Sequence, residues 1–215
     1  MIINHNHRAY KSKAKRIGKN RYNGAYYYSK EICENIIPNV KTNRNWITIN
    51  VPGFGCNHAI VFIHNNLHPE HYDWLSKYKD LILVCGVPET CSKVAHLGKA
   101  IYLPLSVDMP YVLKYAKAEK TKDTAFVGRV GKAKYGDLPQ GINYLCGMKR
   151  QDLLKQMADY RYVYAVGRTA IEAKILGCEV LPYDKRFPDP GFWQILDNVQ
   201  AAVILQELLN QIDEI

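Results

Sequence analysis

The chain has 215 residues, 47% of them hydrophobic, which is enough for one large domain or two small domains with packed cores. Its net charge is +9 and its pI is about 9.2. No run of about 18 apolar residues occurs, which excludes a membrane-spanning helix. The start of the chain, Met1 to His5, is too short and too polar for a signal peptide.

The positive charge is concentrated near the start of the chain, because no acidic residue precedes Glu31. The cations of residues 8–21 are Arg8, Lys11, Lys13, Lys15, Arg16, Lys19 and Arg21. This basic arm predicts an anionic partner: nucleic acid, a nucleotide-sugar or a phosphorylated acceptor. The alternative is a solvated arm that only aids solubility. The candidates for contacting nucleic acid or another acceptor are Lys11, Lys13, Lys15 and Arg16.

The six cysteines are scattered and form no C-x-x-C pair. Cys85, Cys146 and Cys178 fall in apolar runs, and we expect them to be buried thiols. Unpaired thiols are typical of a reducing compartment, so we expect a cytoplasmic protein.

In the first half, strands and helices are expected to alternate. The expected strands are residues 1–4, 46–51, 59–64, 80–85 and 100–103, and the expected helices are 25–37, 69–78, 88–97 and 109–118. The runs 59–64 and 80–85 are continuously apolar, as in strands covered on both faces. The alternation predicts an open, mostly parallel sheet. A charged linker, residues 119–123, predicts a domain boundary, with domains at 1–118 and 119–215.

The second half restarts with a strand at residues 124–129. Residues 131–141 hold Pro139 and three glycines and predict a loop. A strand at 142–146 and a helix at 149–160 follow, and an amphipathic helix at 199–212 closes the chain.

Residues 163–184 predict a strand, a turn, a helix and a second strand. Gly167 breaks the first strand, Thr169 can cap the helix, and Gly177 can end it. Such a βαβ unit is parallel and right-handed. The helix start attracts phosphate, Arg168 and Thr169 add donors, and Glu172 can accept a ribose diol. The alternative is an ordinary crossover whose helix starts with a charged residue.

Residues 167–173, Gly-Arg-Thr-Ala-Ile-Glu-Ala, followed by Leu176 to Val180, resemble the donor-binding segment of GT-B-fold glycosyltransferases, as in the family 1 and family 4 type. The resemblance implies that Glu172 holds the ribose of a nucleotide-sugar and that Gly167, Arg168 and Thr169 hold its diphosphate. Many members carry a further glutamate where this chain has Tyr164.

Other stretches resemble further parts of the same family. Residues 60–64 are similar to the strand whose terminal histidine faces the cleft, which makes His64 the first candidate for the catalytic base and His5 the second. Residues 103–108 resemble the Pro-x-Gly-Val-Asp segment between the halves, with Ser106 in place of glycine. Asp73 and Asp108 are further candidates for the base.

The remaining donor contacts are implied by the start of the second half. Arg129 matches the arginine of the family's Gly-Arg pair, and Lys132 or Lys134 could be its lysine. The loop of Cys146, Gly147 and Met148 would contact the nucleobase of the donor.

The resemblance implies an α/β fold of two small Rossmann-like parallel-sheet lobes facing a cleft. Residues 1–118 would form the acceptor lobe with its basic arm, and residues 119–215 the nucleotide-sugar donor lobe. It implies a metal-independent glycosyltransferase that needs no cofactor and takes a UDP- or GDP-sugar as co-substrate. Its acceptor would be polar. Nucleic acid is a suitable acceptor because the basic arm could bind it, as in the DNA-modifying GT-B enzymes of phages.

Two alternatives stay open: a non-catalytic nucleotide-binding module, and a basic nucleic-acid-binding protein on the same scaffold.

Overall fold

The computed structural model describes residues 3–4, 24–48, 55–63, 67–128 and 137–213. The chain forms two compact units. The first unit is Met1–Pro104 together with Asn198–Ile215, and the second is Leu105–Asp197. The sequence-based boundary between residues 118 and 119 differs from this division in two ways. The units separate at Pro104, and the C-terminal helix belongs to the first unit.

The first unit is built on a five-stranded parallel sheet whose strands follow chain order. Its strands are β1 (Ile3–Asn4), β2 (Asn45–Ile47), β3 (Ala59–Ile63), β4 (Leu81–Cys85) and β5 (Lys99–Tyr102). The register sets Ile63 beside Cys85 at the carboxyl ends of β3 and β4. The predicted parallel sheet is confirmed.

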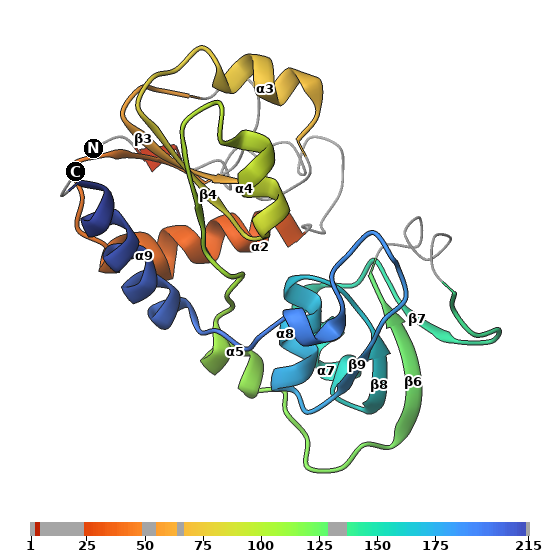
Figure 1. Ribbon diagram of the computed structural model, residues 1–215. Coiled ribbons are helices and arrows are strands. Elements are labelled where there is room, and N and C mark those ends of the chain that lie inside the picture. The colour runs from red at the N-terminus through yellow and green to blue at the C-terminus, as the bar shows by residue number, and fades with distance from the viewer. Residues whose placement is uncertain (1–2, 5–23, 49–54, 64–66, 129–136, 214–215) are drawn as a thin grey trace, which may run out of the picture. The chain divides into compact units, whose positions relative to one another are not determined.

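Helices cover both faces of this sheet. They are α2 (Gly24–Glu31) with the π-helical turn η1 (Ile32–Ile36) and the 3₁₀ turn η2 (Ile37–Asn39), α3 (Pro69–Leu75), α4 (Pro88–Val94) and α9 (Asn198–Asp213). Figure 1 shows α2 and α9 on one side of the sheet and α3 and α4 on the other. Phe62 packs edge-on against Tyr28 of α2, whereas its neighbour Val61 belongs to the core that includes Trp74 of α3. Because the two central strands β3 and β4 are buried on both faces, they are apolar at every position.

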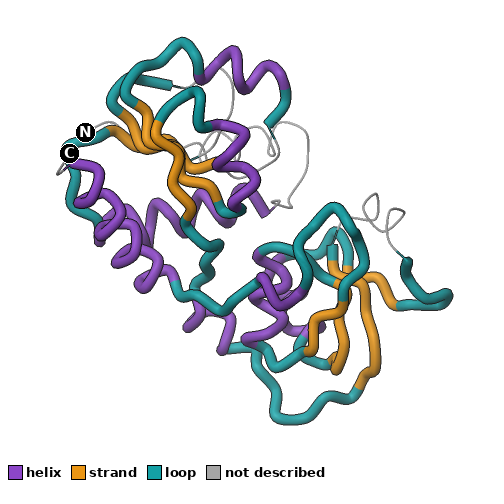
Figure 2. Tube along the Cα trace, in the orientation of Figure 1, coloured by secondary structure: helices purple, strands orange, loops and turns teal. Residues whose placement is uncertain are grey.

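The second unit is built on a four-stranded parallel sheet with the order β7-β6-β8-β9. Its strands are β6 (Lys122–Val127), β7 (Asn143–Leu145), β8 (Tyr160–Tyr164) and β9 (Glu179–Leu181). Its helices are α5 (Met109–Leu113), α7 (Arg150–Met157), α8 (Arg168–Ile175) and the 3₁₀ turn η3 (Pro190–Phe192). Figure 2 shows the strands of this unit side by side with helices packed against them.

The strand order of the second unit reverses around β6. The chain leaves β6 for its neighbour β7 on one side and then crosses to β8 on the other side. This reversal is a topological switch point, where the loops after two adjacent strands turn in opposite directions and leave a crevice at the carboxyl edge. The switch point lies between β6 and β8.

Lys120 joins α7 and α8 at their carboxyl ends. Its Nζ donates to Ala158 O at 2.9 Å and to Leu176 O, the C-cap carbonyls of α7 and α8. A cation at a helix C-terminus satisfies orphan carbonyls and the negative end of the helix dipole. Lys122 and Asp123 lie in β6. The segment expected to be a linker is therefore packed into the second unit.

The two parallel α/β units are consistent with Rossmann-like lobes. Within the part of the chain that the structure describes, no helix is long and apolar enough to cross a membrane. The six cysteines are free, with Cys85 and Cys178 buried as expected. Cys146 is only half-buried, because it follows the last residue of β7 at the edge of the core.

Candidate functional site

The turn between β8 and α8 is the centre of the candidate site. The strand ends at Tyr164, and Gly167 is the N-cap of α8 with φ 63° and ψ −141°. This region of backbone space is open to glycine almost alone. The expected cap Thr169 instead lies inside the first turn, where its hydroxyl and N–H make no hydrogen bond with any described residue. The N-cap therefore lies two residues earlier than the predicted Thr169, and it has no side-chain hydrogen bond.

Glu172 lies one turn into α8 and is bound by two arginines. Arg150 Nη2 donates to Glu172 Oε1 at 2.7 Å, and Arg168 Nη2 lies 3.6 Å from the same oxygen. The side chains of Arg150 and Glu172 are 10% and 8% exposed. Both arginines engage Oε1, and no described residue provides a partner for Oε2. Glu172 thus orders two arginines through one of its carboxylate oxygens.

Arg150 is the first residue of α7 and was not predicted as a site residue. Its guanidinium lies 5.1 Å from the centre of the Tyr111 ring, in cation–π geometry. A cation in the first turn of a helix is unfavourable, because the helix dipole is positive there. Arg150 at this position therefore indicates that an anionic side chain lies nearby. Sequence spacing could not name that anion, since Glu172 is on the next helix.

The predicted base-binding residues also reach this edge of the second unit. Cys146, Gly147 and Met148 follow β7, and the register pairs Leu145 with Val127, the last residue of β6. Burial raises the pKa of the Cys146 thiol, and a hydrogen bond with the Gly128 backbone partly offsets it. The candidates for contacting the nucleobase therefore lie at the carboxyl edge of the second sheet, where α8 also starts.

A cavity of about 210 Å³ lies beside the β8–α8 turn. Ala165 and Val166 of the turn line it, together with Asp137 and much of the segment Pro182 to Pro190. Three of its lining residues are aspartates: Asp137, Asp184 and Asp189. Lys185 also lines the cavity, and carboxylates accept hydrogen bonds from hydroxyl groups, so the lining suits a polar ligand such as a sugar. We had not predicted this cavity from the sequence.

The far wall of the cavity is fixed by side chains from the core. The Tyr183 ring packs edge-on against Phe126 at 5.1 Å, and burial raises the pKa of Tyr183 to about 12. Arg186 Nε donates to Asp184 Oδ1 at 2.9 Å. Lys174 of α8 donates to Pro190 O at 2.6 Å and to Trp193 O at 2.7 Å, and burial lowers its pKa. The wall is therefore attached to the same helix that starts at the turn.

Several predicted residues lie outside the described residues. They are His5, His64, Arg129, Lys132, Lys134, Lys11, Lys13, Lys15 and Arg16. Asp73 is exposed on α3, and Asp108 caps α5 by accepting from Tyr111 N at 3.0 Å. The described residues include no group of three or more His, Cys, Asp or Glu side chains that could hold a metal ion.

Comparisons of the chain with protein-family models, with curated proteins and with solved structures find no match. Arguments about function therefore rest on the geometry of the site and on the local sequence pattern.

Proposed function

We propose that the second unit binds a nucleotide-sugar, with its diphosphate at the start of α8, and that the protein is a metal-independent glycosyltransferase of the GT-B type. The observation that carries the proposal is the coincidence of the switch point between β6 and β8 with the uncapped amino end of α8 at Gly167. In open parallel α/β sheets, ligands bind at such points, and helix amino ends favour phosphate.

Different residues around the β8–α8 turn would contact different parts of the nucleotide-sugar. The Thr169 hydroxyl and the first-turn N–H groups would take the diphosphate, and Arg168 would add positive charge beside it. Glu172 would accept a ribose hydroxyl on Oε2 while Oε1 stays with Arg150. The cavity that Asp184 and Asp189 line would take the sugar.

Transfer of the sugar would need charge stabilisation on the departing diphosphate and a base for the acceptor hydroxyl. The helix dipole of α8 and the cations near it would supply the first. His64 is our proposed base, with His5 as the second choice. The sugar would be transferred to a polar acceptor. Nucleic acid is one such acceptor, and the basic arm would bind it.

A non-catalytic nucleotide-binding protein is the second candidate. Tyr164 favours it, because this residue ends β8 where the resemblance has a glutamate that contacts the donor sugar. Both candidates predict nucleotide binding at the same turn, whereas only the transferase predicts turnover.

Two measurements separate the candidates. Thermal unfolding of the full chain with a panel of UDP- and GDP-sugars should show a rise in Tm for at least one of them, because a ligand that binds only the native state stabilises it. Release of UDP or GDP from that sugar nucleotide, followed by chromatography, should then show hydrolysis or transfer. Binding without release would leave only the non-catalytic candidate, and no stabilisation by any member would remove both.

The ribose contact has its own test. Wild-type protein should bind UDP or GDP more tightly than the matching 2′-deoxynucleotide, and Glu172→Gln should reduce that difference, because an amide is a weaker acceptor than a carboxylate. Equal affinities of the ribose and deoxyribose forms for wild-type protein would argue against the role of Glu172.

A further inference from the structure

The first unit has a cavity of its own at the carboxyl edge of its sheet. Helix α3 follows β3 and helix α4 follows β4, and the ends of these strands lie side by side at Ile63 and Cys85. A cavity of about 220 Å³ lies between the two helices and is lined by Leu67, Tyr72, Thr90 and Lys93. The carboxyl edge of a parallel sheet is where such folds bind ligands.

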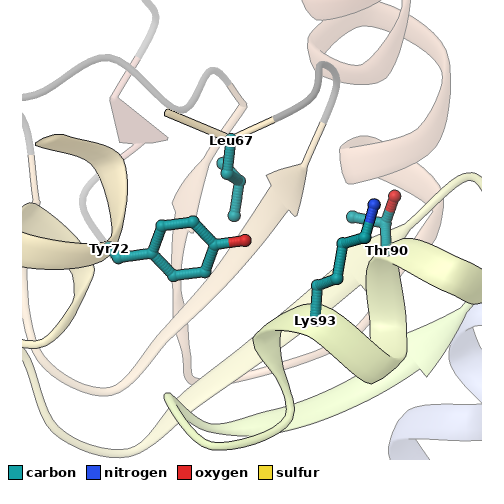
Figure 3. A pocket seen from close by; sticks show the side chains of 4 residues that line it. All are labelled: Leu67, Tyr72, Thr90 and Lys93. Atoms are coloured by element: carbon teal, nitrogen blue, oxygen red, sulfur yellow. The ribbon is translucent and has the colours of Figure 1, made fainter. Parts of the chain in front are cut away.

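Of the described residues that line the cavity, Tyr72, Thr90 and Lys93 have side chains that donate hydrogen bonds. Figure 3 shows the Tyr72 hydroxyl and the Lys93 ammonium directed toward the same space, with the Thr90 hydroxyl beside Lys93. Among the described residues, none accepts a hydrogen bond or forms an ion pair with these three groups. None of the four lining residues is acidic. The cavity thus offers one positive charge and two hydroxyls to an anion.

The helices hold these donors in place. The Tyr72 ring stacks on His96 with 5.9 Å between the centres and 13° between the planes. The start of α3 is closed by a hydrogen bond from His68 N to His71 Nδ1 at 3.0 Å. Trp74 of α3 and Val94 of α4 are buried in the core of the unit. Donors on packed helices need little reordering to meet a ligand.

We propose that this cavity binds the phosphate group of a small phosphorylated molecule. A phosphate presents several oxygens in a tetrahedral arrangement, which matches donors that come from two helices on different sides. Leu67 and the Tyr72 ring form an apolar wall for the carbon atoms next to the phosphate. The volume suits one phosphate group with a few attached atoms. This inference does not rest on the proposed nucleotide site, which lies in the other unit.

The test is a calorimetric titration of the full chain at constant ionic strength. The probes are inorganic phosphate, glycerol 3-phosphate, a 5′-phosphorylated dinucleotide and acetate. The variants are Lys93→Gln, Tyr72→Phe and Thr90→Val. The matched control is Lys99→Gln, which removes the same charge from an exposed residue at the opposite edge, since Lys99 pairs with Ile82 near the start of β4.

We expect phosphate and glycerol 3-phosphate to bind at millimolar or lower concentrations and acetate to bind more weakly. Lys93→Gln should weaken binding about tenfold, as for loss of a charge-assisted hydrogen bond. Tyr72→Phe and Thr90→Val should each weaken it several-fold, while Lys99→Gln stays within about twofold of wild type. The proposal is overturned if wild type binds neither phosphate compound, if Lys93→Gln and Lys99→Gln lose affinity equally, if acetate binds as tightly as phosphate, or if only the dinucleotide binds.

Discussion

Arg150 and Glu172 form a buried ion pair that joins the first turn of α7 to α8. Arg150 Nη2 lies 2.7 Å from Glu172 Oε1, and neither side chain is more than 10% exposed. The pair fixes the orientation of α8 next to the carboxyl edge of the sheet. Because of this ion pair, Glu172 contributes to the stability of the second unit in addition to its proposed contact with the ribose.

Replacement of Glu172 by alanine should destabilise the second unit strongly. Arg150 and Arg168 would lose their shared acceptor inside the unit, and breaking a buried pair costs about 3–5 kcal/mol. Urea unfolding measures the change. Glu179→Ala, at an exposed position that starts β9, is the control and should stay within about 0.5 kcal/mol. A Glu172→Ala protein as stable as the control would mean that the ion pair contributes nothing.

Gly167→Ala should destabilise the protein by about 1–3 kcal/mol, because alanine at φ 63° and ψ −141° is strained. Space is not the reason, since an added Cβ would meet only Leu105 Cδ1 at 3.8 Å. Gly191→Ala is the control: its Cβ would meet nothing within 4 Å, and its φ is not positive. Equal unfolding midpoints for the two variants in urea would refute the assigned turn geometry.

Lys120→Met should cost about 1–2 kcal/mol, because the C-cap carbonyls Ala158 O and Leu176 O would lose their charged donor. The apolar replacement keeps most of the side-chain volume. Lys155→Met, at an exposed position of α7, removes the same charge without removing a cap. Chemical unfolding that shows equal stabilities for these two variants would contradict the capping role of Lys120.

A fourth prediction concerns pH and the amino edge of the first sheet. The His58 ring, at 2.5 Å, and the Arg44 guanidinium hold the pKa of Asp80 below its usual value. Because the folded pKa lies below the unfolded value of about 3.9, this stabilisation is complete above that pH and disappears as the pH falls through the folded pKa.

Wild-type protein should therefore be more stable than Asp80→Asn at about pH 6, and the difference should shrink as the pH is lowered toward about 3. Urea unfolding at several pH values gives the two curves. Asp73→Asn, an exposed acid on α3, should run parallel to wild type. A difference between wild type and Asp80→Asn that grows on acidification would have the wrong sign.

The strands that are buried on both faces were predicted well from the sequence. The strands Ala59–Ile63 and Leu81–Cys85 contain no polar residue, and their ends lie within one residue of the predicted ends. Helix ends were less predictable. The helix expected to reach residue 160 ends at Met157, because Tyr160 already pairs with Lys122 in the sheet.

The candidate site was predictable only in part. The β8–α8 turn and its glycine follow from the local pattern of residues 163–177. The partner of Glu172 does not, because Arg150 is on another helix and the contact depends on how α7 and α8 pack. The cap at Gly167 was missed because Thr169 is the better cap by residue type, and the positive φ is set by the path from β8 to α8.

The most direct test of the proposed nucleotide site is an amide ¹H–¹⁵N NMR titration of the full chain with UDP and with GDP, compared with uridine and guanosine. The account predicts that at least one diphosphate shifts the amide signals of Arg168 and Thr169 most strongly, with smaller changes at Gly128, and that the nucleosides shift the signals of Arg168 and Thr169 much less. Diphosphate-induced shifts that avoid the start of α8, or the absence of any shift, would contradict it.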